Sequence, residues 1–116
     1  MENENKCTID TYFYVKSDHR LVKVELSKLL YVECIKDYLK LHIQNQRPIM
    51  TLMTMKMIEE RLPQPQFMRI HRTYIIQTSK IDYVNKGSVS IAGNNLPISA
   101  GYRNDFFSFI EKYTII

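Results

Sequence analysis

Positively charged side chains gather in the middle of one short stretch, FMRIHRTYII at residues 67–76. Arg69, His71 and Arg72 lie between aromatic and β-branched residues, whose types predict β-strand at both flanks. A strand that only filled an apolar core would not carry three such groups. A guanidinium group can form two parallel hydrogen bonds with a phosphate, or with O6 and N7 of guanine. The stretch therefore points to an anionic partner.

The charge around this stretch is also unbalanced. The chain has 116 residues and a formal net charge of +4. Between positions 61 and 103, six basic residues stand against the single acid Asp82, a local balance of +5 (six minus one). They are Arg61, Arg69, Arg72, Lys80, Lys86 and Arg103. Such a concentration favours a polyanion such as nucleic acid, although charge alone indicates a solvated basic face equally well.

Other kinds of chemistry find little support in the residue types. The chain contains three glycines, and no glycine-rich phosphate-binding loop can be written. The three histidines lack the close spacing of metal ligands, so we expect neither a metal nor a cofactor. Cys34 lies in an apolar run, where a small buried thiol is the ordinary interpretation and a nucleophile paired with a histidine a weak alternative. We therefore expect a protein that is not an enzyme.

The length of the chain fits a single domain. Residues 1–10 are polar and acidic and predict an N-terminal tail or the remnant of a linker, and residues 11–116 predict the folded domain. Two cysteines, one of them Cys7 in that tail, make a disulfide framework improbable and favour a reducing compartment. No apolar run is long enough for a signal peptide or a membrane span. We expect a cytoplasmic protein without a membrane partner.

Alternating apolar residues predict two β-hairpins and a further strand in the first half of the domain. The second hairpin turns at Lys36 and Asp37. Its return strand places Tyr38, Lys40 and His42 on the outer face, opposite a row of leucine and isoleucine residues. The expected strands are TYFYVKS (11–17), RLVKVEL (20–26), LLYVECI (29–35), YLKLHIQ (38–44) and PIMTLM (48–53).

Apolar residues at helical spacing predict one short internal helix and one C-terminal helix. In MTMKMIEERL, Met55, Ile58 and Leu62 share a face that we interpret as core filling, and Thr54 is the expected N-cap. Ser99 is the expected N-cap of the second helix. The apolar stripe of that helix comprises Tyr102, Phe106, Phe109, Ile110 and Tyr113. The brief strands IDYV, VSI and LPI complete a mostly β chain, typical of a sandwich or a stack of small sheets.

Together with the upstream LLYVECIKDYLKLHI and the downstream IDYV and LPIS, FMRIHRTYII resembles the LytTR domain, the LytR/AlgR-type DNA-binding module of bacterial response regulators. The resemblance covers about residues 12–113. Its most specific parts are F-x-R-x-H-R-S/T-Y-I-I/V at residues 67–76 and Y-I/V-E-x-x-x-x-Y at residues 31–38. It implies an elongated, mostly β fold of small antiparallel sheets, which pushes loops rather than a recognition helix into successive major grooves.

The resemblance also implies where bases are read. Family members use the loop before the Tyr38-type strand, the segment after the histidine of the H-R-S/T motif, and the loop leading into the last helix. In this chain those places hold residues 36–38, Arg72 and residues 99–103. Some members carry a base-contacting arginine directly after the serine, whereas here Ala100 follows Ser99 and the nearest arginine is Arg103.

The remaining candidates differ in what they are expected to do. Arg72 is expected to contact a base or a phosphate. Arg69 either braces its strand or reaches the DNA backbone, and His71 is expected to be buried and hydrogen-bonded. Asp37 is expected to shape its turn, with a contact to a cytosine amine as the alternative. The predicted DNA-binding residues are Lys36, Asp37, Tyr38, Lys40, Arg69, Arg72, Lys80 and Arg103.

The function implied by the resemblance is sequence-specific binding of double-stranded DNA by a transcriptional regulator. Family members often bind direct repeats as dimers, so promoter repeats and a homodimer on DNA are expected partners. The domain would be the output of a two-component phosphorelay, with a receiver domain or a sensor upstream. The alternative is a protein-interaction module that docks a partner chain along an open strand edge.

Overall fold

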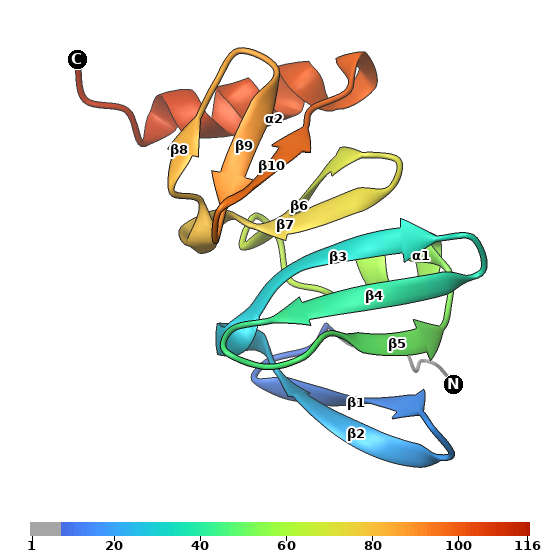
Figure 1. The fold of residues 1–116 in the computed structure, drawn as a ribbon. Helices are drawn as coiled ribbons and strands as arrows, with labels where there is room; N and C mark the ends of the chain where they lie inside the picture. Colours follow the sequence, from blue (N-terminus) through green and yellow to red (C-terminus); the bar gives the residue numbers. More distant parts are fainter. Residues whose placement is uncertain (1–7) are drawn as a thin grey trace, which may run out of the picture.

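The computed structural model describes residues 8–116 and folds them into three small antiparallel sheets, stacked along the length of the molecule (Figure 1). Extents of 47 × 35 × 25 Å confirm the elongated, mostly β fold expected from the sequence. The elements are β1 (Tyr12–Ser17), β2 (Arg20–Glu25), β3 (Leu29–Ile35), β4 (Tyr38–Ile43), β5 (Ile49–Leu52), α1 (Met55–Glu59), β6 (Phe67–His71), β7 (Tyr74–Gln77), β8 (Tyr83–Val84), β9 (Ser88–Ile91), β10 (Asn94–Pro97) and α2 (Ala100–Lys112).

The central sheet has five strands in the order β5-β4-β3-β7-β6 and contributes to two separate cores. The first core lies between this sheet, the β1–β2 hairpin and α1, and the second lies between it, the β8–β10 sheet and α2 (Figure 1). Strand β3 sends Val32 into the first core and Tyr31 into the second. LLYVECI is nearly continuously apolar because successive side chains enter opposite cores.

Helix α1 closes the first core as the sequence pattern predicts. The hydroxyl of Thr54 accepts the backbone N–H of Met57 at 3.1 Å and caps the helix. Met55, Ile58 and Leu62 are buried, which confirms their expected role as core filling. The helix is shorter than the pattern and ends at Glu59, so Leu62 reaches the core from the turn that follows.

Helix α2 differs from the expectation in two respects. Ser99 occupies the N-cap position, but its hydroxyl makes no capping bond; its backbone carbonyl accepts the N–H of Tyr102 at 3.0 Å. Phe106 is fully buried, whereas Tyr113 is 72% exposed, so the predicted apolar stripe is wrong at its C-terminal end. The last turn of α2 extends beyond the edge strand β8 and has no sheet beneath it (Figure 1). Phe107 packs on the second core instead.

The stretch FMRIHRTYII is a hairpin and not one continuous strand. Strands β6 and β7 pair with His71 opposite Tyr74, so Arg72 and Thr73 form the turn. Nδ1 of His71 accepts the backbone N–H of Thr73 at 3.1 Å and lies 2.9 Å from the Thr73 hydroxyl. This local bond stabilises a chain reversal in place of further strand pairing. Arg72 is therefore at the tip of a hairpin.

The first described residues of the chain pack against the domain. The backbone N–H of Ile9 donates to the carbonyl of Arg61 at 2.8 Å, and the Ile9 side chain packs against the first core. Ile9, which we expected in the tail, is thus part of the packing, while Cys7 and the residues before it lie outside the described range. Between residues 8 and 116, no helix is long and apolar enough to cross a membrane.

Candidate nucleic-acid interface

Three connections come together at one edge of the molecule. They are the β3–β4 turn (residues 36–37), the β6–β7 turn (residues 72–73) and the β10–α2 connection (residues 98–99), at the right of Figure 1. The Ser99 N–H donates to the carbonyl of Ile70 at 2.9 Å and fastens the third connection to β6, the strand that leads into the second. We call this edge the loop edge. Strand polarity explains it, because β3, β6 and β10 all end there.

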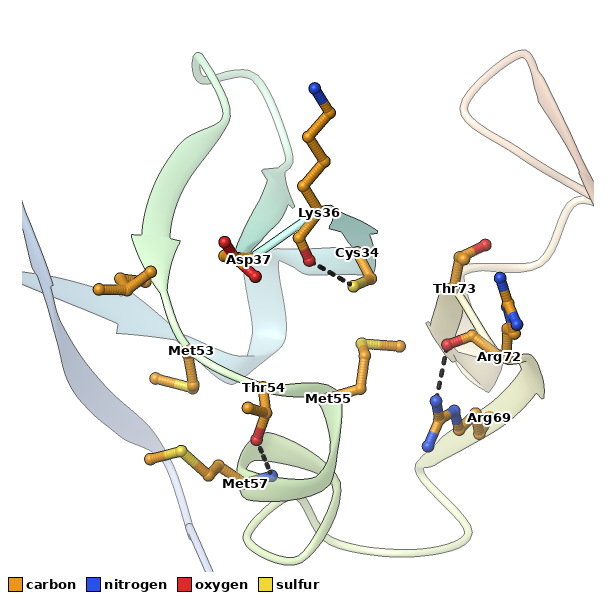
Figure 2. A pocket seen from close by; sticks show the side chains of 11 residues that line it. Cys34, Lys36, Asp37, Met53, Thr54, Met55, Met57, Arg69, Arg72 and Thr73 are labelled. Carbon is orange, nitrogen blue, oxygen red and sulfur yellow. Dashed lines mark hydrogen bonds between the residues drawn. The ribbon is translucent and has the colours of Figure 1, made fainter.

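A hollow of about 850 Å³ separates the first two turns (Figure 2). Four of the eight predicted DNA-binding residues line it: Lys36, Asp37, Arg69 and Arg72. Its other lining residues are mainly apolar or sulfur-containing. They come from β3, from the β6–β7 turn and from the stretch between the end of β5 and the first turn of α1: Cys34, Leu52, Met53, Thr54, Met55, Met57 and Thr73. The fold thus gathers residues that are 36 positions apart in the sequence at one place.

The cations on the rim of the hollow are free to meet a ligand. Within residues 8–116, the side chains of Lys36, Asp37 and Arg72 make no hydrogen bond or ion pair, and all three residues are exposed. Figure 2 shows the ammonium of Lys36 and the guanidinium of Arg72 pointing away from the hollow. Lys36 adopts φ 56°, a left-handed conformation that favours glycine. The backbone at this position is therefore strained for a lysine, in comparison with glycine.

Arg69 is engaged inside the protein. Its Nη1 donates to Oε1 of Glu59 at 2.8 Å, its Nη2 to the carbonyl of Arg72 at 2.6 Å, and its Nε to the carbonyl of His71 at 3.4 Å. Its guanidinium carbon also lies 5.8 Å from the ring centroid of Tyr102 in α2. Of the two roles expected for Arg69, these contacts favour bracing.

Arg103 is also engaged by backbone carbonyls. Its Nη1 donates to the carbonyl of Lys86 at 2.6 Å and its Nη2 to that of Ile98 at 3.5 Å. Arg103 thereby ties the β8–β9 turn to the segment before α2. The two bonds leave other N–H groups of this exposed guanidinium without a protein acceptor among residues 8–116.

The other predicted residues lie farther from the hollow. Lys80 follows β7 and donates to Oε1 of Gln44 at 3.2 Å. Gln44 follows the last residue of β4, whereas residues 36–37 precede the first, so Lys80 lies about 20 Å away at the opposite end of the sheet. Tyr38 and Lys40 occupy the outer face of β4, as predicted, and Tyr38 is 46% exposed.

An aromatic cluster covers the outer face of β3 beside Lys40. The Tyr31 ring stacks on His42 with centroids 4.1 Å apart, and Nε2 of His42 lies 2.9 Å from Oε1 of Glu33. Burial, and then the nearby Glu33 carboxylate, raises the pKa of Tyr31 above its ordinary value. The pKa of Tyr74 is raised by burial, by the charge of Glu33 and by its hydrogen bond to Glu33. Both tyrosines therefore stay neutral hydrogen-bonding groups at physiological pH.

Sequence reasoning did not place the first hairpin beside these connections. The β1–β2 turn lies at the same side of the molecule as the loop edge (Figure 1). Lys16, His19 and Arg20 line a second hollow of about 940 Å³, together with Tyr38. Basic residues on both sides of a predicted hairpin turn were the available signal, but the β1–β2 pattern alone does not say at which edge that turn lies.

Comparison with solved structures identifies the class of fold. A structural match is the LytTr DNA-binding domain of a putative methyl-accepting/DNA response regulator from Bacillus cereus. It has a TM-score of 0.77 and 20% identity, and the match covers 87% of this chain and 97% of that one. The similarity shows that both share one β-rich fold. None of the curated protein sequences compared with this chain matches it.

The family follows from the sequence itself. The family model described as the LytTr DNA-binding domain matches residues 19–111, which is most of the chain. The chain belongs to the LytTR family of DNA-binding domains. This confirms the resemblance found in the sequence motifs and assigns the domain to DNA binding and transcription regulation.

Proposed function

We propose that this domain binds double-stranded DNA in a sequence-specific manner through the loop edge. The observation that carries the proposal is the common placement of the three connections, two of which present cations without protein partners among residues 8–116. The long axis of 47 Å exceeds the 34–36 Å that separates successive major grooves on one face of B-DNA. One molecule is therefore long enough to reach from one groove into the next.

The exposed side chains have distinct roles in this proposal. Arg72, on a hairpin tip, enters the major groove, where its guanidinium can pair with O6 and N7 of guanine. Lys36 follows the phosphate backbone, which needs charge but little fixed geometry. Asp37 stands beside Lys36 and disfavours close approach of a phosphate. Its side chain makes no hydrogen bond within residues 8–116 that would shape the turn, so we assign it to a cytosine amine.

The biological setting is part of the same proposal. We infer that the domain is the output module of a cytoplasmic response regulator, controlled by a receiver domain or a sensor. Two copies would occupy direct repeats in a promoter. The similar Bacillus cereus domain is described as part of a putative response regulator, which is consistent with this setting.

Selection of bound duplexes from a random pool tests the function. We expect enrichment of one short sequence motif that occurs as a direct repeat. The protein-interaction alternative predicts a different outcome: no enrichment, no retention on a DNA or heparin column, and recovery of a defined protein partner. A pool that remains random after repeated rounds would contradict sequence-specific binding.

Replacement of Lys36 by glycine should separate stability from DNA binding. Glycine removes the left-handed strain at this position but increases the entropy of the unfolded chain, so we expect a change between zero and about +1 kcal/mol in the free energy of unfolding. The same variant should lose one phosphate contact, which makes the log–log salt slope shallower by about 0.9. Urea unfolding and fluorescence anisotropy measure the two effects.

Lys23→Ala is the control for this variant. Lys23 lies on the outer face of β2, over the ring of Tyr12 at 4.6 Å, away from the loop edge. Its replacement removes the same charge and should leave the salt slope nearly unchanged. An equal loss of slope in both variants would show that only net charge matters.

A further inference from the structure

Glu59, an acidic residue of α1, is connected through Arg69 to the backbone of the β6–β7 turn. Its carboxylate accepts from Nη1 of Arg69 at 2.8 Å, and Nη2 of the same guanidinium donates to the carbonyl of Arg72 at 2.6 Å. The side chains of Glu59 and Arg69 are 33% and 20% exposed. Partial removal from water strengthens such charge-assisted bonds relative to those of a surface pair.

The guanidinium of Arg69 joins three elements at one point. Besides Glu59 of α1, it contacts the carbonyl of His71 at 3.4 Å and faces the ring of Tyr102 in α2 at 5.8 Å. The turn is also held from within, because His71 accepts the Thr73 N–H, and from β3, because the Cys34 N–H donates to the Thr73 carbonyl at 2.9 Å. The carbonyl of Arg72 itself is held by Arg69.

We propose that Glu59 is a positioning residue for DNA binding: through Arg69, it fixes the backbone from which Arg72 reaches the DNA. This inference rests on the proposed function and adds to it a residue that does not touch DNA. A fixed backbone matters because a two-point contact with guanine needs a defined direction of the guanidinium. Without Glu59, the turn samples other conformations, and the apparent affinity falls with the fraction that remains competent.

The direction in which Glu59→Gln changes the affinity for DNA distinguishes this proposal from simple electrostatics. Glu59→Gln removes one negative charge beside a cationic surface, so attraction to a polyanion alone predicts tighter binding. It would also release Arg69 to act as an additional phosphate contact. The positioning role predicts the opposite, a loss of about tenfold in affinity if the competent fraction of the turn falls to about one tenth. The salt slope should stay unchanged, because no phosphate contact is lost.

The experiment uses a fluorescein-labelled duplex taken from the random-pool selection, with Glu111→Gln as the control. Glu111 is exposed on the last turns of α2, and its replacement changes net charge equally without touching the turn. We expect about tenfold weaker binding by Glu59→Gln and wild-type or slightly tighter binding by Glu111→Gln. Glu59→Gln binding as tightly as wild type, or tighter, would overturn the proposal.

A double-mutant cycle separates positioning from a general loss of structure. In an Arg72→Ala background, Glu59→Gln should cost less than about threefold in affinity, because the side chain that it positions is already absent. A full tenfold cost in both backgrounds would overturn the proposal. If Glu59→Gln does not fold, as judged by its thermal unfolding, Arg69→Lys replaces it, since an ammonium keeps the charge but cannot reproduce the fork of three contacts.

A readout without DNA keeps this proposal distinct from the proposed function. Amide hydrogen exchange at Thr73 should be faster in Glu59→Gln than in wild type, while exchange at the core strand β9 stays the same. Unchanged exchange at Thr73 would contradict the positioning role. Failure of the wild-type protein to bind any selected duplex would instead contradict the proposed function, whatever the exchange result.

Discussion

Arg72→Ala should weaken binding to the selected duplex by about 1–3 kcal/mol, or roughly 5- to 150-fold. The side chain is exposed at the tip of the β6–β7 hairpin and has no partner within residues 8–116, so its removal leaves the packing intact. If Arg72 reads guanine, the loss should also relax the sequence preference at one position of the motif. Anisotropy titrations with duplexes changed at single base pairs measure both effects.

Arg47 offers a matched control for this experiment. It is exposed in the β4–β5 connection, at the opposite end of the central sheet from the loop edge (Figure 1). Arg47→Ala makes the same change in charge and should lower the affinity much less. Equal losses in the two variants, or full affinity in Arg72→Ala, would show that the hairpin tip is not the site of contact.

Phe106→Ala should destabilise the domain by about 3–5 kcal/mol. Phe106 projects from α2 into the second core, where it is fully buried in a cluster with the isoleucine and valine residues of β7 and β9. Its truncation leaves a cavity that the short strands around it cannot close. Because domains of this size are commonly stable by only about 5–15 kcal/mol, urea unfolding should show a large fall in midpoint.

Tyr113, the C-cap residue of α2, provides the comparison. Its side chain is 72% exposed, and Tyr113→Ala should change the free energy of unfolding by about 0.5 kcal/mol or less. Phe106→Leu keeps most of the buried volume and should be intermediate, which makes the series informative even if Phe106→Ala is unfolded. Similar costs for Phe106→Ala and Tyr113→Ala would contradict the burial pattern described for α2.

The sequence predicted the elements whose residue pattern depends only on neighbouring positions in the chain. Strand β4 alternates strictly because only one of its faces enters a core, and its outer residues Tyr38 and Lys40 lie where the alternation indicates. Thr54 caps α1 because the capping bond spans three residues only and needs no tertiary partner. Such features depend on neighbours in the chain, which a single sequence contains.

Tertiary contacts decided the features that the sequence did not reveal. FMRIHRTYII has the composition of one strand, and its reversal at Arg72 depends on the pairing of β7 with β3. Ser99 occupies the N-cap position, but it is held there by the bond from its backbone N–H to Ile70 of another element, and its hydroxyl makes no capping bond. Arg69 looked like an ordinary cation because its partner Glu59 lies ten positions upstream in a helix whose orientation no local pattern fixes.

In the candidate site, too, the sequence predicted some features, and only the fold revealed the others. Lys36, Arg72 and the loop into α2 were selected by a family resemblance, and the fold brings them to one edge. Lys80 was selected with them because it belongs to the same basic segment. However, a four-residue strand and a short helical turn carry it to the other end of the sheet. Charge density along a chain does not define a surface until strand directions are known.

The salt dependence of binding tests the central claim most directly, namely that cations on the loop edge meet the phosphates of a double helix. Affinity of the wild-type domain for the selected duplex would be measured by anisotropy from about 50 to 300 mM salt. Lys36, which the proposal assigns to the phosphate backbone, predicts a log–log slope of about −0.9, and a contact of Arg72 with a phosphate would bring the slope to about −1.8. A slope near zero would contradict that claim.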